Sequence, residues 1–214
     1  MQLIRKVLVS FIFVLCGLAA KAETIVVAAL GDSLTQGYGL PIQHGFVPQM
    51  ERWLLAQGAN VRLINAGVSG DTTAGGAVRV DWTLTPDVDA MIVALGGNDL
   101  LRGLDPEYAR LNLGKILKAA RAADVEVLLV GLEAPSNYGA AYKRAFDGIY
   151  PELAKAFGTL YAPNFFQGFP NGQDLQAARH LMQSDGIHPN TSGVTQIVEG
   201  LGPHVLELVA KAQD

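Results

Sequence analysis

The stretch TIVVAALGDSLTQGYGL, residues 24–40, decides how the chain is expected to fold. Its first seven residues are apolar or β-branched without alternation, which is typical of a strand buried on both faces of a sheet. The run stops at Gly31, and Asp32 and Ser33 open a polar, glycine-rich segment. The stretch therefore predicts a buried strand that ends in a loop carrying a serine.

Four more apolar runs follow, and helical segments with apolar residues at a spacing of 3.6 separate them. The runs are VRLINAG (61–67), AMIVALG (90–96), VEVLLVGL (125–132) and the weaker TLYAPNF (159–165). The first three suit strands buried on both faces. The helical segments are marked by Phe46 to Leu54, Tyr108 to Ala119, Tyr142 to Leu153 and residues 191–211. Strands that alternate with helices predict an α/β fold, a parallel sheet with helices on both faces.

The first 22 residues have the features of a secretory signal peptide. Arg5 and Lys6 precede the apolar run 7–20, and small residues at Ala20 and Ala22 suit cleavage after Ala22. Because about 14 apolar residues are short for a membrane span of ~20, we expect no stable span in the mature chain. A lipid anchor on Cys16 is the other alternative. We expect a periplasmic or secreted protein with one domain over residues 23–214.

Composition restricts the functions open to this mature domain. Cleavage removes three of the 16 basic residues and no acid, which leaves 13 against 20 acidic residues and a net charge of −7. A chain this acidic, without a basic stripe, is not expected to bind nucleic acid. Cleavage also removes Cys16, the single cysteine, so the site must be built without thiols. The sequence does not indicate the oligomeric state.

The loops after the strands are where a parallel sheet binds its ligands, and the first of them holds Ser33. Ser33 and Gln36 fit a capping box, so the serine has a purely structural interpretation. The same place at a helix N-terminus would surround a nucleophilic hydroxyl with backbone N–H groups. The loop alone leaves both interpretations open.

The second and third loops offer donors for a developing negative charge. Residues 65–73 (NAGVSGDTT) contain Gly67 and Gly70, which allow a close approach of the backbone. Residues 95–104 present Asn98, whose uncharged amide can stabilise an oxyanion without titrating. The structural alternatives are a helix-capping turn in the second loop and an Asx turn in the third.

The fourth loop, residues 184–193, combines Asp185 and His188 at a spacing of three. In a turn this spacing can bring the carboxylate to Nδ1 of the imidazole, which leaves Nε2 to accept a proton from Ser33. A metal-binding pair is the alternative, but no third imidazole or thiol accompanies it, so we expect no metal and no cofactor. Nucleophile, oxyanion donors and oriented base together predict acyl transfer through an acyl-enzyme.

The sequences of these loops resemble those of the GDSL, or SGNH, hydrolases. Within this family they are most similar to the exported bacterial arylesterase, lysophospholipase and acyl-CoA thioesterase group. The matching blocks are GDSLTQGYGL (31–40), NAGVSGDTTAGG (65–76), GGNDLLRGL (96–104), APSNYGAAY (134–142) and DGIHPN (185–190). The resemblance spans essentially the whole mature chain. It implies a flavodoxin-like three-layer sandwich whose five parallel strands have the order 2-1-3-4-5.

The resemblance also implies roles for single residues. Ser33 matches the nucleophile, His188 the general base and Asp185 its orienting acid, while Gly67 and Asn98 join the Ser33 N–H as oxyanion donors.

A second set of positions is expected to bind substrate. It comprises Asp32, Gln36, Leu100, Leu101 and Tyr138. Asp32 is expected to act more on loop structure than on proton transfer.

We therefore expect a serine esterase acting on aryl and alkyl esters, with acyl thioesters and lysophospholipids as further candidates. The substrate would be a small-molecule ester or lipid. A carbohydrate O-deacetylase of the same fold is the alternative within hydrolases, and a non-catalytic lipid-binding domain is the alternative outside them. A nucleotide-binding domain is weaker, since Gly31, Gly37 and Gly39 do not fit G-x-G-x-x-G.

Overall fold

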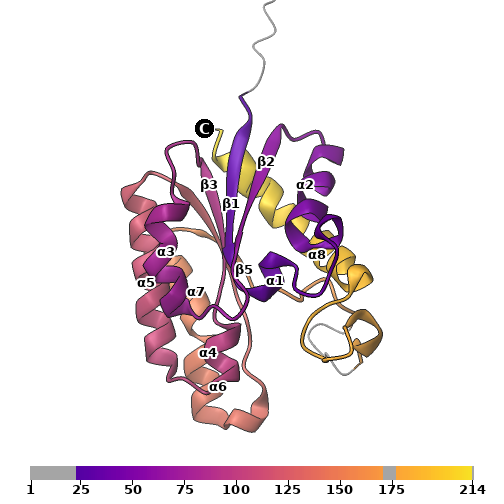
Figure 1. Ribbon diagram of the computed structural model, residues 1–214. Coiled ribbons are helices and arrows are strands. Elements are labelled where there is room, and N and C mark those ends of the chain that lie inside the picture. The colour runs from indigo at the N-terminus through magenta and orange to yellow at the C-terminus, as the bar shows by residue number, and fades with distance from the viewer. Residues whose placement is uncertain (1–22, 171–176, 214) are drawn as a thin grey trace, which may run out of the picture.

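The structure, a computed structural model, describes residues 23–170 and 177–213. Its centre is a five-stranded parallel sheet in the order β2-β1-β3-β4-β5 (Figure 1). The strands are β1 (Ile25–Gly31), β2 (Val61–Gly67), β3 (Ala90–Ala94), β4 (Glu126–Val130) and β5 (Leu160–Ala162). All five apolar runs form strands, and the fold class and strand order are confirmed.

Helices cover both faces of this sheet (Figure 1). One face carries α2 (Phe46–Ala56) and α8 (Thr191–Lys211), and the other carries α3 (Thr73–Thr83), α5 (Pro106–Ala122), α6 (Ala140–Asp147) and α7 (Ile149–Phe157). Shorter helices lie in the loops: α1 (Ser33–Gln36), α4 (Gly97–Leu101), η1 (Ile42–His44), η2 (Ser136–Tyr138) and η3 (Arg179–Leu181).

The central strand β1 explains why the opening run is apolar without alternation. Val27 and its alternate neighbours pack with the α2 and α8 side, and Ala28 and Leu30 pack with the α3 and α5 side. All seven residues of β1 are buried. The strand thus contributes to two hydrophobic cores, one on each face.

Strand β2 differs from its expectation. The run 61–67 was expected to be buried on both faces, but Arg62 and Asn65 are exposed while Val61 and Leu63 are buried. The physical reason is position, because β2 is an edge strand with β1 as its single neighbour.

Two helical expectations also need correction. The segment from Tyr108 to Ala119 was marked by Tyr108, Leu111, Ile116 and Ala119. Ile116 is buried, but Tyr108 and Leu111 are 64% and 53% exposed, and α5 packs through Leu113 beside Ile116. The segment marked by Tyr142 to Leu153 forms two helices, because α6 ends at Asp147 and α7 begins at Ile149, with Gly148 between them as the cap of both. The closing helix is α8, with the expected bounds.

Residues 1–22, with the predicted signal peptide and Cys16, lie outside the described residues. Within the part of the chain that the structure describes, no helix has the length and apolarity needed to cross a membrane.

Candidate active site

The carboxyl ends of the strands meet at one end of the sheet, and the chain changes direction there. From β1 it first moves outward to β2 and then returns to the other side of β1 as β3. Such a switch point opens a crevice between the loops of the two neighbouring strands. Ser33 follows β1 and Asn98 follows β3, so both lie at this crevice.

Asp32, and not Ser33, caps the short helix α1. The Asp32 carboxylate accepts a hydrogen bond from Leu34 N at 3.0 Å, and its backbone oxygen accepts from Gln36 N at 2.9 Å. The capping-box interpretation of Ser33 is therefore wrong. The serine is the first helical residue, and among the described residues its N–H has no acceptor.

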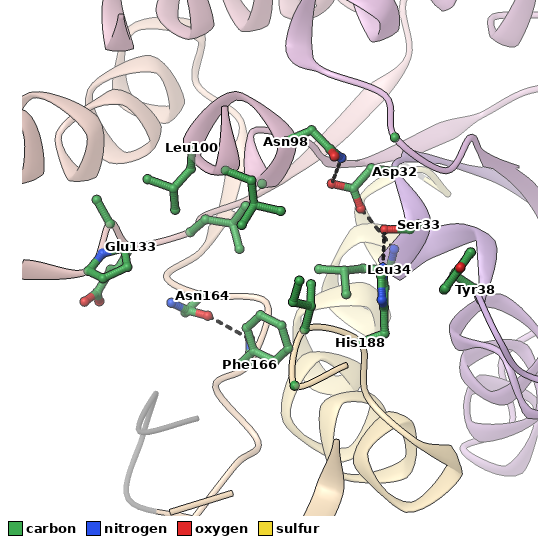
Figure 2. Close-up of a pocket in the computed structure, with 18 of the residues that line it drawn as sticks. Asp32, Ser33, Leu34, Tyr38, Asn98, Leu100, Glu133, Asn164, Phe166 and His188 are labelled. Carbon is green, nitrogen blue, oxygen red and sulfur yellow. Dashed lines mark hydrogen bonds between the residues drawn. The ribbon is translucent and has the colours of Figure 1, made fainter. Parts of the chain in front are cut away.

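Ser33, His188 and Asp185 form one hydrogen-bonded line, of which Figure 2 shows Ser33 and His188. His188 Nε2 lies 2.9 Å from Ser33 Oγ, and His188 Nδ1 lies 2.7 Å from Asp185 Oδ2. The other carboxylate oxygen of Asp185 accepts from the backbone N–H groups of Ile187 and His188. These hydrogen bonds, first the one from the imidazole, lower the pKa of Asp185 to about 2, so the carboxylate is charged at neutral pH.

The histidine loop is held in place by Gln183. Its backbone N–H donates to His188 O at 2.8 Å, and its side-chain amide donates to Pro189 O at 3.0 Å and Tyr38 O at 2.8 Å. The ring of Tyr38 in turn lies 4.6 Å from the imidazole, centroid to centroid. Gln183 thereby joins the loop after β1 to the loop before α8, which are about 150 residues apart.

Asp32 and Asn98 meet behind the nucleophile. Asn98 Nδ2 donates to Asp71 O at 2.9 Å and, at a longer 3.3 Å, to Asp32 Oδ2. The Asp32 side chain is buried, and this burial raises its pKa to about 6. The hydrogen bond from Leu34 N, the charge of His188 and the Asn98 amide act in the opposite direction and keep the rise moderate.

Gly67 does not occupy the place expected of an oxyanion donor. Its N–H donates to Asn65 Oδ1 at 3.0 Å, and it is not among the residues that line the pocket beside Ser33. A Cβ at this position would lie 2.3 Å from Gln36 N, so Gly67 allows α1 to pack against β2. Gly70 lines the pocket instead, with φ of +82°, a conformation that favours glycine. Within the described residues its N–H has no acceptor.

Arg79 ties the strand ends and the Gly70 loop together. Its guanidinium donates to Gly31 O at 2.8 Å, Ala66 O at 2.6 Å and Asp71 Oδ2 at 2.6 Å. The side chain is 20% exposed, so this three-way contact lies largely within the protein. Arg102 also holds this loop in place, because its guanidinium donates to Gly70 O at 2.8 Å.

A pocket of about 850 Å³ extends from Ser33 along the strand ends toward β4 and β5 (Figure 2). Its apolar wall is formed by Leu34, Leu100, Leu101, Leu132, Phe166 and Ile187. Asp32, Leu100 and Leu101, three of the five expected substrate-binding residues, line it. Gln36 and Tyr138 do not: Gln36 accepts a hydrogen bond from Ser69, and Tyr138 donates to Leu100 O at 2.8 Å.

The geometry agrees with comparisons with known proteins. The model of the GDSL-like Lipase/Acylhydrolase family matches residues 29–195, which include the whole site. The chain belongs to this family. The resemblance inferred from the sequence is thus confirmed, and the loops that carried it are those that converge at the pocket.

Several relatives of this GDSL-like hydrolase match over nearly their full length. Esterase TesA of Pseudomonas aeruginosa is 36% identical over 191 residues, which cover 89% of this chain and 91% of that protein. Thioesterase 1/protease 1/lysophospholipase L1 of Escherichia coli is 34% identical over 201 residues, which cover 93% and 91%. The crystal structure of AlinE4, an SGNH-hydrolase family esterase, is 43% identical with a TM-score of 0.70, and the match covers 86% of this chain and 96% of that one.

Sequence reasoning missed three residues of this GDSL-like hydrolase site. Gly70 was noted beside Gly67 but received no role of its own. Gly67 is the last residue of β2, whereas Gly70 lies in the loop beyond the strand, where ligands bind, so Gly70 was the better candidate for an oxyanion donor. Asn164 follows β5 and lines the pocket, and the rule that ligands bind beyond strand ends pointed to it as well. Arg79 carried no local signal, because its three acceptors come from different segments.

Proposed function

We propose that this chain is a serine esterase that hydrolyses carboxylic esters through an acyl-enzyme on Ser33. The observation that carries the proposal is the hydrogen-bonded line of Ser33 Oγ, the two ring nitrogens of His188 and the Asp185 carboxylate. A serine hydroxyl is a weak nucleophile unless a positioned base removes its proton, and this arrangement supplies the base.

The reaction then proceeds in two halves. Ser33 Oγ attacks the ester carbonyl while His188 Nε2 takes its proton, and the charged imidazolium is stabilised by Asp185. The tetrahedral intermediate collapses when His188 returns the proton to the departing alcohol, which leaves the acyl group on Ser33. Water, activated by His188 in the same way, then attacks the acyl-enzyme and releases the acid.

Three donors are available to stabilise the oxyanion. We assign this role to the N–H of Ser33, the N–H of Gly70 in place of Gly67, and the side-chain amide of Asn98. The first two have no acceptor among the described residues, and Gly70 lies in the pocket wall. Of the two Asn98 hydrogen bonds, the one to Asp32 is longer, so this N–H can exchange its acceptor for the oxyanion of the substrate. The shorter bond to Asp71 O keeps the amide in place.

The pocket favours esters with an apolar part. Its leucine-rich wall and its volume of about 850 Å³ suit aryl and alkyl esters larger than an acetate. The thioesterase and lysophospholipase names of the Escherichia coli relative make acyl thioesters and lysophospholipids further candidates.

We also propose that the protein is exported to the periplasm or the medium, with cleavage after Ala22. The basic start, the apolar run 7–20 and the small residues before Glu23 support this destination. Mass spectrometry of the exported protein should find an N-terminus at Glu23, and an intact N-terminus would contradict the proposal.

The test is hydrolysis of p-nitrophenyl esters from acetate to long acyl chains by the wild type and Ser33→Ala. We expect turnover that rises beyond acetate, and a loss of about 10³-fold or more in kcat for Ser33→Ala without loss of folding. Turnover of acetate alone would favour the carbohydrate deacetylase. An unchanged rate in the variant would contradict the role of Ser33, and no turnover by folded wild type would favour a binding domain.

A further inference from the structure

A polar side chain interrupts the apolar wall of the pocket on the β4–β5 side. Asn164 follows β5, lines the pocket and is 3% exposed (Figure 2). The apolar residues Leu132 and Phe166 line the same part of the pocket. Asparagine is uncommon in such a buried place unless its amide is fully hydrogen-bonded.

The orientation of this amide is fixed by the backbone. Asn164 Oδ1 accepts a hydrogen bond from Phe166 N at 2.8 Å. Because a peptide N–H can only donate, the oxygen must face Phe166 and the nitrogen must point the other way. Figure 2 shows the nitrogen of Asn164 on the side away from Phe166.

The amide nitrogen of Asn164 is a donor that finds no acceptor within residues 23–170 and 177–213. Among the residues described, two side-chain polar atoms are both fully enclosed and without a partner, the hydroxyls of Thr35 and Thr159. The Asn164 nitrogen has no partner either but is not one of these atoms, so it is not fully enclosed. It therefore reaches the open space of the pocket, where water or a bound molecule must satisfy it.

The surroundings restrict the group that can accept this hydrogen bond. Glu133 and Lys143 also line this side of the pocket, and Lys143 Nζ is engaged by Asp147 at 2.7 Å and Ala134 O at 2.8 Å. Because the carboxylates of Glu133 and Asp147 both lie beside the Lys143 ammonium, the local charge disfavours an anionic ligand. An uncharged oxygen, as in an ether, hydroxyl or carbonyl group, fits the donor better.

The donor is also distant from the reaction. β5 lies three positions from β1 in the sheet, so at ~4.8 Å per strand the loops that carry Asn164 and Ser33 begin roughly 14 Å apart. The oxyanion donors belong to the loops after β1, β2 and β3. The Asn164 amide is thus suited to an oxygen several bonds away from the ester carbonyl.

We propose that Asn164 is a specificity-determining residue that selects esters with an uncharged oxygen on the substrate arm that enters the β4–β5 side of the pocket. This inference rests on the proposed esterase function. The preferred substrate is an ester with an apolar stretch next to the scissile bond and an ether, hydroxyl or carbonyl oxygen further along the same arm.

The test compares plain esters with esters in which one methylene, remote from the carbonyl, is replaced by an ether oxygen. One series varies the acyl arm of p-nitrophenyl octanoate at its fifth, sixth or seventh position, and the other varies the alcohol arm of octyl butyrate. The measured quantity is the ratio of kcat/KM for the oxygen-containing ester to kcat/KM for the plain ester.

Two variants take the donor out of the pocket and keep an oxygen for Phe166 N. Asn164→Asp replaces the pocket-facing NH₂ by an oxygen that only accepts, and Asn164→Ser shortens the side chain so that its O–H cannot reach the position of the amide nitrogen. We expect the ratio to fall by about tenfold in both variants for one of the two series, because one neutral hydrogen bond is lost. Asn137→Asp makes the same chemical change at an exposed residue outside the pocket and should leave the ratio as in the wild type.

The outcomes separate this inference from the one on which it rests. If the wild type hydrolyses plain esters but the ratio is the same in wild type, Asn164→Asp and Asn164→Ser for both series, Asn164 does not select substrate. If folded wild type hydrolyses none of the esters, the proposed esterase function fails and this inference fails with it.

Discussion

At the scale of single residues, Asp32 is a buried carboxyl group that holds its proton more tightly than an exposed one. It is 3% exposed, and burial raises its pKa from 3.8 to about 6. The folded protein therefore binds this proton more tightly than the unfolded chain does. By linkage, the contribution of Asp32 to stability falls as the pH rises through the interval between these two values.

Replacement of Asp32 by asparagine removes this pH dependence. Relative to the wild type, Asp32→Asn should gain on the order of 2–3 kcal/mol in the free energy of unfolding between about pH 4 and pH 8, since one pKa unit corresponds to about 1.4 kcal/mol. Urea denaturation of both proteins at the two pH values measures the difference. A difference that does not change with pH would show that Asp32 titrates normally.

Two buried threonines differ in whether the hydroxyl has a partner. Thr35 Oγ1 has none among the described residues, whereas Thr73 Oγ1 donates to Asp99 at 2.6 Å. Thr35→Val should leave the free energy of unfolding unchanged or raise it by up to about 1 kcal/mol, because valine has the same shape and no polar atom. Thr73→Val is the matched control and should lower it by about 1–3 kcal/mol. A large loss in Thr35→Val would reveal a hydrogen bond to that hydroxyl.

At the scale of secondary-structure elements, the glycines show where helices pack closely and where they do not. A Cβ at Gly67 would lie 2.3 Å from the backbone of α1, whereas a Cβ at Gly114, within α5, would have no atom within 4 Å apart from its chain neighbours and the nearby backbone of its own helix. The first glycine is needed by the contact of α1 with β2. The second lowers helix stability without a packing reason.

The same substitution at these two glycines should have opposite effects. Gly67→Ala should lower the free energy of unfolding by about 1–3 kcal/mol through overpacking, and it should lower kcat because α1 begins at Ser33. Gly114→Ala should raise stability by about 0.5–1 kcal/mol. Thermal unfolding of both variants measures the signs. A neutral Gly67→Ala would mean that α1 shifts without cost.

Elements were predictable from the sequence where the local pattern matched the local environment. Buried strands such as β1 have continuous apolar sequences because helices cover both faces of the sheet. The edge position of β2 depends on the whole sheet. The strand order implied by the family resemblance contains it, but the apolar pattern of the run 61–67 alone does not, so the exposure of Arg62 was missed. The division between α6 and α7 depends on Gly148, which interrupts a periodic pattern that continues on both sides.

At the scale of the whole molecule, the hydrogen-bonded line that we propose to be catalytic was accessible from the sequence, and the pocket wall was not. Ser33, Asp185 and His188 stand in short patterns whose chemistry is local. Gln36 and Tyr138 were expected to bind substrate because they lie near those patterns, but both contact neighbouring loops instead. Which side chains face a cavity depends on how distant loops meet, as the position of Asn164 after β5 illustrates.

The strand order also distributes two tasks along the sheet. The groups that we propose to react come from the loops after β1, β2 and β3 and from the turn before α8. Leu132, Asn164 and Phe166 come from the loops after β4 and β5. Inherited variation in the second set of loops can therefore adapt such an enzyme to new ester substrates while its reacting groups are kept. A library of variants confined to the loops after β4 and β5 should therefore change which esters the enzyme accepts without changing the groups that react.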